Sequence, residues 1–345
     1  MRSVTAVVLG AGSRGSTYAG YAKEFPEELQ IAAVAEPRAD RRNMLADKLS
    51  IPEENRFASW QELLAKPKMA DCAFVCTLDD DHLEPAIRAM ELGYHLLLEK
   101  PMSNTEAECR AIVETAKRTG RKLAVCHVLR YTPFFMTLKR LIDEGRIGEV
   151  TTINQIENVG YWHQAHSFVR GNWRTVRENS PMILQKSCHD MDIIVWLMGK
   201  DCVRVQSFGS LKHFTPENAP SGAPERCLDG CPHAEACPYY APRLYLDMNR
   251  TGWPVDVITT DMSEAGRRKA LEEGPYGRCV YRCDNDVVDH QTVNMLFEGD
   301  VTVTFRCCGR KITAIGGNGK LPVEQCDGRY KVTIPKNGGV LITAE

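Results

Sequence analysis

Residues 4–16, VTAVVLGAGSRGS, join a short apolar run to three closely spaced glycines and then to a helical stretch that extends to about Lys23. This order of strand, glycine turn and helix is typical of a dinucleotide-binding βαβ unit. Gly10 permits a tight turn, Gly12 lets the backbone approach a pyrophosphate, and Gly15 allows close helix packing. The N-terminus of the following helix would supply unpaired amides for the phosphates.

Strands and helices alternate over the first third of the chain. The apolar runs IAAVA (31–35), CAFVCT (72–77) and HLLL (95–98) are each followed by polar or helical segments, and KLAVCHV (122–128) returns as a strand. Alternation of this kind predicts a parallel, doubly wound sheet with right-handed crossovers. We therefore expect an α/β protein whose residues 1–127 form an NAD-binding Rossmann domain.

Residues 128–345 follow a different pattern. Long strands such as EVTTINQIENVGY (149–161) and DVVDHQTVNMLFEG (286–299) are separated by glycine turns rather than helices. They predict a second α/β domain with an open, mostly antiparallel sheet. The Pro-, Gly- and Cys-rich segment 215–242 interrupts that pattern and is predicted to be an inserted loop.

Charge and composition narrow the function classes. The chain has 43 basic and 45 acidic residues and a net charge of −2, so it lacks the basic surface expected of a nucleic-acid-binding protein. It also lacks an apolar run of about 20 residues and a signal-peptide pattern. We expect a cytoplasmic protein that binds neither nucleic acid nor membrane, with most of its 14 cysteines reduced.

Glu36 follows the second predicted strand and is placed to accept hydrogen bonds from the adenosine ribose hydroxyls. A carboxylate at this position repels a 2′-phosphate, which favours NAD over NADP. Arg38, Arg41 and Arg42 follow closely and could offset that repulsion. NAD is the expected cofactor, and NADP remains the alternative.

The stretch LLLEKPMSN (96–104) ends a buried strand on a Glu-Lys pair. Pro101 has no amide proton to give to a sheet, so the strand must stop there and leave Lys100 at its C-terminal end. Open α/β sheets bind ligands at that end of their strands. Lys100 is therefore a candidate site residue, and the alternative is an ordinary surface lysine.

Together with the glycine turn, the EKP motif makes the chain resemble the glucose-fructose oxidoreductase, inositol dehydrogenase and rhizopine-catabolism (Gfo/Idh/MocA) family of NAD(P)-dependent oxidoreductases. The resemblance extends to CTLDDDH (76–82), RYTPFFMTLKRLIDEGRIGEV (130–150) and CHDMDIIVWLMG (188–199). It implies a Rossmann domain, a substrate-binding and dimerisation domain, a nicotinamide at their interface and a homo-oligomer formed through the C-terminal sheet. The cofactor contacts expected from the motifs are Gly10, Gly12, Ser13, Arg14, Gly15, Glu36, Arg38, Thr77, His82, Glu99 and Lys100.

The resemblance implies an enzyme that oxidises a hydroxyl of a sugar, polyol or sugar derivative. Removing a hydride from a carbinol carbon requires the hydroxyl proton to leave too, so we expect Lys100, with His189 or Tyr161, to act as acid or base. The family usually has an aspartate four residues before the histidine, whereas this chain has Gln185, which cannot exchange protons. An NAD-dependent glycosidase without net redox change and a non-catalytic NAD- or sugar-binding sensor remain alternatives.

Two segments supply candidate substrate contacts. Gln185, His189 and Asp192 have helical spacing and would share one helix face. The segment GYWHQAHSFVRGNWR (160–174), predicted to run from a strand into a loop, contains the aromatic and polar side chains that a carbohydrate pocket requires. The predicted substrate-binding residues are His163, His166, Arg170, Trp173, Arg174, Gln185 and Asp192.

The segment CLDGCPHAEACPYY (227–240) resembles a metal knuckle. Cys227, Cys231 and Cys237 would be three ligands of a structural zinc ion, and Cys279 is the expected fourth. Cys283 or His233 could take the place of Cys279. The alternatives are a loop of reduced cysteines and an iron–sulfur cluster. With four protein ligands the metal would have no open position and no catalytic role.

Overall fold

The computed structural model describes residues 2–309 with their side chains and, beyond them, the backbone of five strands. These strands are β11 (Ile312–Gly316), β12 (Gly319–Lys320), β13 (Val323–Cys326), β14 (Arg329–Val332) and β15 (Val340–Ala344). They form one sheet in the order β12-β11-β15 and one β13-β14 pair. The C-terminal end of the predicted domain 128–345 lies outside the residues whose side chains are described.

The chain forms two compact units. The first comprises Met1–Thr132 and Arg177–His189, and the second comprises Pro133–Val176 and Asp190–Glu345. The segment 177–189 belongs to the first unit although it lies beyond the predicted domain boundary at residue 127. Hydrogen bonds connect it to loops at the strand ends of that unit. The Ser180 hydroxyl donates to the buried Asp79 carboxylate at 2.7 Å, and the Asn104 amide donates to a carbonyl of this segment.

The first unit contains a six-stranded parallel sheet in the order β3-β2-β1-β4-β5-β6. Its strands are β1 (Val4–Leu9), β2 (Leu29–Ala35), β3 (Arg56–Phe57), β4 (Cys72–Val75), β5 (His95–Leu98) and β6 (Leu123–Val125). This order reverses direction between β1 and β4, as in the Rossmann fold. The doubly wound parallel sheet predicted from the sequence is confirmed. Strand β3 was not predicted, because its two residues are too few to form a recognisable pattern.

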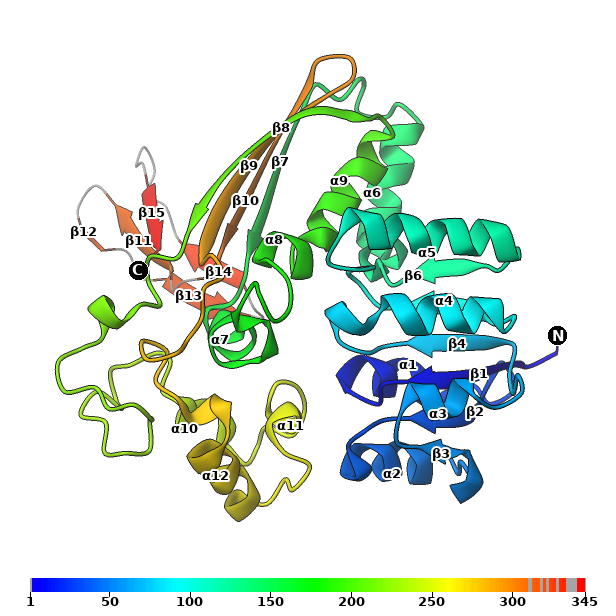
Figure 1. Cartoon of the computed structure of the whole chain (residues 1–345). Helices are drawn as coiled ribbons and strands as arrows, with labels where there is room; N and C mark the ends of the chain where they lie inside the picture. The colour runs from blue at the N-terminus through cyan, green and yellow to red at the C-terminus, as the bar shows by residue number, and fades with distance from the viewer. Residues whose placement is uncertain are drawn as a thin grey trace. The chain divides into compact units, whose positions relative to one another are not determined.

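Helices cover both faces of this sheet (Figure 1). They are α1 (Ser13–Glu24), α2 (Ala39–Lys48), α3 (Trp60–Leu64), α4 (Leu83–Glu91) and α5 (Glu106–Thr119), with short turns η1 (Glu53–Asn55), η2 (Asp79–Asp81) and η3 (Val128–Tyr131). Alternate residues of a strand point to opposite faces. In β1, Val7 and Leu9 therefore pack with α3, α4 and α5, whereas Ala6 and Val8 pack with α1 and α2.

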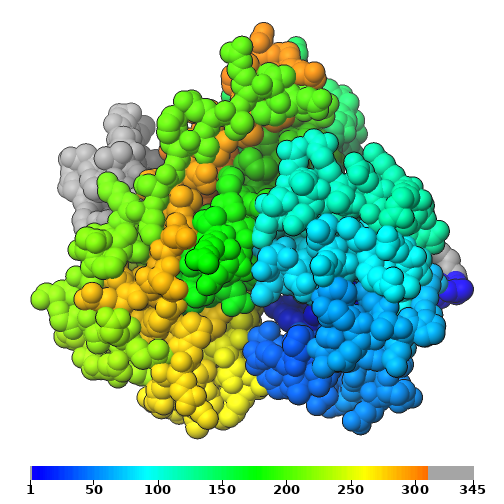
Figure 2. Space-filling view, viewed as in Figure 1, coloured from blue at the N-terminus to red at the C-terminus, as the bar shows by residue number. Residues whose placement is uncertain are grey.

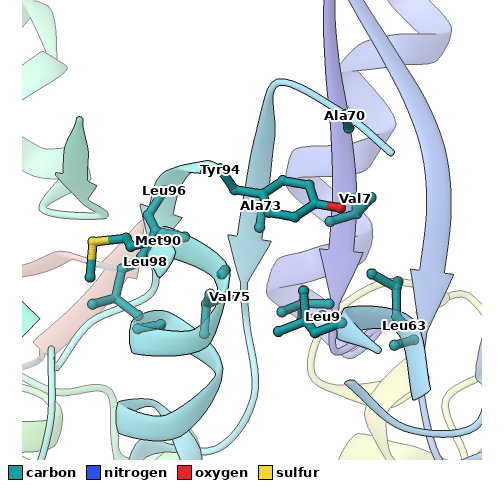
Figure 3. Close-up of a cluster of buried hydrophobic side chains, with 14 of the residues drawn as sticks. Val7, Leu9, Leu63, Ala70, Ala73, Val75, Met90, Tyr94, Leu96 and Leu98 are labelled. Atoms are coloured by element: carbon teal, nitrogen blue, oxygen red, sulfur yellow. The ribbon is translucent and has the colours of Figure 1, made fainter. Parts of the chain in front are cut away.

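Figure 3 shows the cluster on the α4 face, where Val75, Leu96 and Leu98 from neighbouring strands meet Met90 of α4. The Tyr94 ring lies in the same cluster, and its hydroxyl accepts a hydrogen bond from the Met69 amide at 2.8 Å. The one polar atom that the ring carries into the core is thus bonded. This cluster fixes the strand ends that carry the candidate site.

The second unit is built on a sheet in the order β7-β10-β9-β8. Its strands are β7 (Thr152–Asn158), β8 (Cys202–Ser210), β9 (His290–Phe297) and β10 (Val301–Cys308). The β8–β9 and β9–β10 pairs are antiparallel, and β10–β7 is parallel, so the predicted mostly antiparallel sheet is confirmed. One face carries the buried Val293, Val303 and Phe305, and the other is open.

The other elements between residues 133 and 309 of this unit are helical, including α9, whose first two residues belong to the first unit. They are α6 (Pro133–Asp143), α7 (Tyr161–His163), the π-helix η4 (Gln164–Arg170), η5 (Asn172–Arg174), α9 (Cys188–Met198), η6 (Pro216–Asn218), α10 (Ala241–Tyr245), α11 (Val255–Ile258), α12 (Glu264–Glu273) and η7 (Pro275–Gly277). The elements η6 to η7 all lie between β8 and β9, so the insert predicted at 215–242 is part of a longer connection. No helix in the described part of the chain is both long enough and apolar enough to cross a membrane.

Replacing Leu63 with alanine tests the role of the α4-face cluster. Leu63 is fully buried there, so Leu63→Ala should lower the free energy of unfolding of the Rossmann unit by about 2–5 kcal/mol. Urea unfolding followed by circular dichroism measures this change. Met44→Ala on exposed α2 is the control and should change it by less than about 0.5 kcal/mol. Equal effects of the two variants would contradict the assignment of the core.

Candidate active site

The glycine turn lies at the C-terminal end of β1, where the strand order reverses. Gly10 has a φ of +96°, and a Cβ atom there would lie 2.5 Å from the Cys76 carbonyl oxygen at the end of β4. A Cβ atom on Gly15 would clash with the Gly10 carbonyl oxygen. Only glycine satisfies both positions, as the sequence predicts.

The N-terminus of α1 is open for an anion. Gly12 is the N-cap and supplies no side-chain hydrogen bond, and the first turn, which contains Ser13 and Arg14, has no acidic residue. A Cβ atom on Gly12 would meet only the Arg41 guanidinium, at 4.0 Å. Free amides, a positive helix end and a vacant approach to the backbone suit the pyrophosphate of a dinucleotide.

Glu36 lies beside this turn at the end of β2 and is 7% exposed. Its carboxylate accepts hydrogen bonds from the Ala11 amide at 2.9 Å and from the Arg38 amide at 3.0 Å. Two of the three neighbouring guanidinium groups are engaged, because Arg38 pairs with Asp40 at 2.7 Å and Arg42 donates to the Glu36 carbonyl at 2.6 Å. The negative charge of Glu36 therefore faces the glycine turn.

His82 links the ends of two neighbouring strands. Its Nδ1 lies 2.8 Å from the Pro101 carbonyl oxygen, which follows β5, and its Nε2 lies 3.3 Å from the Thr77 carbonyl oxygen, which follows β4. The ring is 1% exposed. His82 and Thr77 thus shape the loops beside the glycine turn and hold the loop that carries Lys100.

Glu99 is buried at the end of β5 and binds three groups. Its carboxylate accepts from the Lys100 amide at 2.7 Å and from the Tyr18 hydroxyl at 2.5 Å, and Arg14 lies 3.9 Å away. Burial and this hydrogen bond raise the pKa of Tyr18. Tyr18 therefore stays a neutral donor that connects α1 to the Glu-Lys pair. Tyr18 is a site residue that the sequence pattern does not single out, because its only signal is its place on α1 three residues after Gly15.

Lys100 is half-buried, and its Nζ donates to the Gln185 backbone carbonyl oxygen at 2.6 Å. The single helix face predicted for Gln185, His189 and Asp192 is wrong, because α8 (Met182–Gln185) ends at Gln185 and α9 begins at Cys188. The last carbonyls of a helix have no partner within it. Because the helix ends there, the Gln185 carbonyl oxygen can accept the hydrogen bond from Lys100. Residue 185 therefore contacts Lys100 through its backbone, whereas the family usually has an aspartate side chain at this position.

His189 lies one residue into α9, and its ring is 6.1 Å from that of His127, in an edge arrangement. Burial, together with the nearby positive charge of Lys100, lowers the pKa of His189 to about 3. The imidazole is therefore neutral near pH 7. Its buried Nδ1 has no hydrogen-bond partner among the described residues. Lys100, Gln185 and His189 belong to the same compact unit as the glycine turn.

The predicted substrate residues other than Gln185 lie in the second unit. Asp192 is on α9, three residues after His189, but not on one continuous helix with Gln185. The prediction of a strand-to-loop segment at 160–174 is wrong, because Tyr161 and His163 form α7, which continues into the π-helix η4. Ala165, Phe168 and Val169 are buried there, and this apolar packing favours a helical segment over a surface loop.

Two of these residues have internal partners. His166 is 2% exposed, its Nδ1 is 2.7 Å from the Tyr245 hydroxyl, and its ring stacks on Tyr276. Burial lowers the pKa of His166 to about 3. Arg170 is equally buried and donates to the Tyr239 carbonyl at 2.8 Å. Both side chains stabilise the second unit, and their contact with substrate stays a prediction.

The other candidates in this segment are more accessible. The Tyr161 ring packs edge-on against Tyr239, and His163 lies edge-on to Trp253 with ring centres 4.8 Å apart. Trp173 and Arg174 form η5, and the Arg174 guanidinium binds the Asp284 carboxylate at 2.9 Å. This hydrogen bond, with a second from Arg278, lowers the pKa of Asp284.

The four predicted metal ligands line one small cavity in the second unit, of about 20 Å³. These residues are Cys227, Cys231, Cys237 and Cys279. The alternative ligands Cys283 and His233 do not line it. Among residues 2–309, no group of three or more His, Cys, Asp and Glu side chains is arranged so that it could hold a metal ion. The metal assignment therefore stays a prediction at this point.

Several curated relatives with detectable similarity are named as oxidoreductases or inositol dehydrogenases, and one, from Mediterraneibacter gnavus, is named 2,7-anhydro-N-acetylneuraminate hydratase. YteT of Bacillus subtilis, named as an oxidoreductase, is 24% identical over 281 residues, which cover 79% of this chain and 64% of the relative. Inositol 2-dehydrogenase 2 of Saccharopolyspora erythraea is 31% identical over 135 residues, covering 39% of this chain and 36% of the relative. The chain spans less than two thirds of the length of these relatives.

The fold also matches solved structures. The myo-inositol 2-dehydrogenase of Lactobacillus plantarum superposes with a TM-score of 0.61 at 13% identity, covering 98% of this chain and 76% of the other. At this identity the likeness shows the fold alone.

Two family assignments cover more than half of the sequence. Residues 4–127 match the oxidoreductase family with an NAD-binding Rossmann fold, and residues 135–229 match the GFO/IDH/MocA C-terminal domain. Both agree with the glycine turn, the Glu-Lys-Pro strand end and the second sheet. The chain belongs to the Gfo/Idh/MocA family of NAD-binding oxidoreductases.

Proposed function

We propose that this protein is an NAD-dependent oxidoreductase that acts on a hydroxyl group of a sugar, a polyol or a sugar derivative. The observation that carries the proposal is the fixed position of Lys100, whose Nζ lies 2.6 Å from the Gln185 carbonyl oxygen. This lysine stands at a strand end in the unit that also holds the glycine turn and Glu36. A lysine that transfers a proton must be held in one position, and this hydrogen bond supplies that restraint.

The residues beside the glycine turn fit NAD. The amides at the N-terminus of α1 would bind the pyrophosphate, and Glu36 would bind the adenosine ribose hydroxyls. When bound, NAD supplies the acceptor for a hydride from the substrate carbon. The engagement of Arg38 with Asp40 and of Arg42 with the backbone supports NAD over NADP, because it leaves these groups less available to a 2′-phosphate.

Lys100 would move the hydroxyl proton. An ammonium group has three donors, and the Gln185 carbonyl accepts from one of them, which orients the group and leaves others for the substrate oxygen. An amide carbonyl cannot take the proton onward, so this chain would not use the Lys-Asp relay usual in the family. The neutral His189 can position the hydroxyl by accepting a hydrogen bond, and Tyr161 stays an alternative acid or base.

Replacing Lys100 with methionine removes the acid or base but keeps most of the side-chain volume. Lys100→Met should leave NAD binding within about twofold and lower kcat by about 10²–10⁴-fold. Stopped-flow detection of NADH and calorimetric titration of NAD, over a panel of sugars and polyols, measure the two quantities. Lys66→Met, an exposed lysine of the same unit, is the control and should keep full activity.

The same assay separates the alternative functions. NADH formation that depends on Lys100 supports the proposal, whereas unchanged turnover in Lys100→Met would refute the proton-transfer role. Cleavage of an aryl glycoside that requires bound NAD but releases no NADH would identify a redox-neutral glycosidase instead. Tight binding of NAD and sugar with no turnover of any kind would identify a sensor.

Replacing Glu36 with serine tests the cofactor preference. The native protein should bind NAD more tightly than NADP, and Glu36→Ser should narrow that ratio by about tenfold, since a hydrogen bond to a charged group contributes about 1.5–3 kcal/mol. Fluorescence titration with both cofactors measures the ratio. Glu27→Ser, on an exposed loop, should leave it unchanged. A native preference for NADP would overturn the assignment of Glu36.

Assembly through the C-terminal sheet is the second part of the proposal. Cross-strand pairing aligns Phe208, Thr292, Arg306 and Ile156 in one row across the open face of the sheet. Phe208 is 64% exposed and Ile156 is 52% exposed, so this face presents apolar side chains that a second copy of the chain could cover.

A charge on this row should prevent self-association. Phe208→Asp should convert an oligomer of the native protein into a smaller species, because a carboxylate is costly to bury in an apolar contact. Light scattering coupled to size exclusion measures the mass. Ile147→Asp, which places the same charge at an exposed site outside the sheet, is the control. A native protein that is monomeric throughout would contradict this assembly.

A further inference from the structure

The cysteine-lined cavity in the second unit is formed by two segments that lie far apart in the sequence. Arg226 and Arg278 form an isolated antiparallel bridge, and the Cys227 amide donates to the Gly277 carbonyl while the Cys279 amide donates to the Glu225 carbonyl. Adjacent residues of an extended strand point to opposite sides. Cys227 and Cys279 therefore share the side of the bridge opposite to the two arginines, and both are more than nine-tenths buried.

The other two cysteines reach the cavity on a compact turn. The Cys237 amide donates to the His233 carbonyl at 2.8 Å, which brings the chain back after Cys231. The Arg243 guanidinium fixes this turn by donating to the carbonyl oxygens of Ala234, Glu235 and Cys237. Figure 2 shows the insert, in lime, lying beside the golden segment near residue 280 on the surface of the unit.

We propose that Cys227, Cys231, Cys237 and Cys279 bind one structural zinc ion through all four sulfur atoms. Four thiolates in a tetrahedral arrangement are a ligand set that selects zinc or an iron–sulfur cluster over hard cations. A cysteine side chain moves its sulfur by rotation about χ1 alone. Binding thus requires the sulfurs to turn toward the cavity centre, with the backbone segments already in place.

The size of the cavity favours a single ion over an iron–sulfur cluster. Its volume is about 20 Å³, and a single water molecule needs about 10–15 Å³ on this scale. One ion fits this space, whereas a cluster of several iron and sulfur atoms would have to push the two segments apart. The hydrogen bonds of the Arg226–Arg278 bridge oppose that separation.

A buried positive charge beside the sulfurs supports the same assignment. Arg170 lines the cavity and is 2% exposed, and its guanidinium donates to the carbonyl oxygens of Arg278 and Tyr239 and to the Cys227 sulfur. No carboxylate among the described residues forms an ion pair with it. Burial of an arginine without a counter-charge is costly. A zinc ion with four thiolates carries a net charge of about −2 and supplies that counter-charge.

The two alternative fourth ligands have other partners in the structure. The Cys283 sulfur donates to the Cys279 carbonyl at 3.3 Å, and His233 Nε2 lies 2.7 Å from the Ser221 carbonyl oxygen. Neither residue lines the cavity. With four protein ligands the zinc has no open position, so its role is to join the insert to the segment at 275–283 rather than to take part in catalysis.

Metal analysis of the whole protein, expressed and purified without added metal or chelator, tests this assignment. We expect about one zinc ion per chain and no stoichiometric iron or acid-labile sulfide. Cys279→Ser and Cys231→Ser should each lose most of the zinc. The matched controls Cys283→Ser and His233→Ala should retain it.

A second measurement on the native protein covers variants that fail to fold. Protein produced with Co²⁺ in place of Zn²⁺ should show the absorption bands of a tetrahedral cobalt–thiolate site, and a thiol-blocking reagent should release the metal in step with the modification of about four cysteines. Folded native protein with no metal, a disulfide among the four cysteines, stoichiometric iron and sulfide, or zinc that survives in Cys279→Ser would each overturn the proposal.

Discussion

The close approach of β1 and β4 at their C-terminal ends is the constraint on which the candidate site depends. Gly10 passes so near the Cys76 carbonyl that no side chain fits between them, and Gly15 meets the Gly10 carbonyl in the same way. These contacts place the N-terminus of α1 directly behind the turn, with its amides uncapped. The ligand-binding edge of the sheet, with Glu36 on one side and the Glu99–Lys100 pair on the other, follows from that packing.

A second constraint concerns how a distant segment completes this edge. Residues 177–189 bond to the loops after β4 and β5 through Ser180, Asn179 and Gln185, and the break between α8 and α9 leaves the Gln185 carbonyl for Lys100. A side-chain carboxylate at that position would accept a proton, but a backbone carbonyl only orients a donor. This difference separates the proton chemistry proposed for this chain from that of a Lys-Asp relay.

Three buried charged side chains, Glu36 and Glu99 in the first unit and Arg170 in the second, each have hydrogen-bond partners that offset part of the cost of burial. Glu99 accepts from Tyr18 and from the Lys100 amide, and Glu36 accepts from two amides of its own neighbourhood. Among the described residues Arg170 has carbonyl and sulfur partners, and the negative charge of the proposed zinc–thiolate site would balance its charge. The same reasoning thus links the cofactor edge to the proposed metal centre.

The sequence alone determined the Rossmann unit, because glycine spacing, apolar runs and the proline after Lys100 act over a few residues each. It also indicated four cysteines as candidate metal ligands and predicted the mostly antiparallel second sheet. Only the tertiary structure decided that Gln185 contacts Lys100 through its backbone carbonyl, that His166 and Arg170 are buried, and that Cys279 rather than Cys283 lines the cavity. These outcomes depend on where helices end and on hydrogen bonds and packing between segments that lie tens of residues apart. A local sequence pattern does not contain that information.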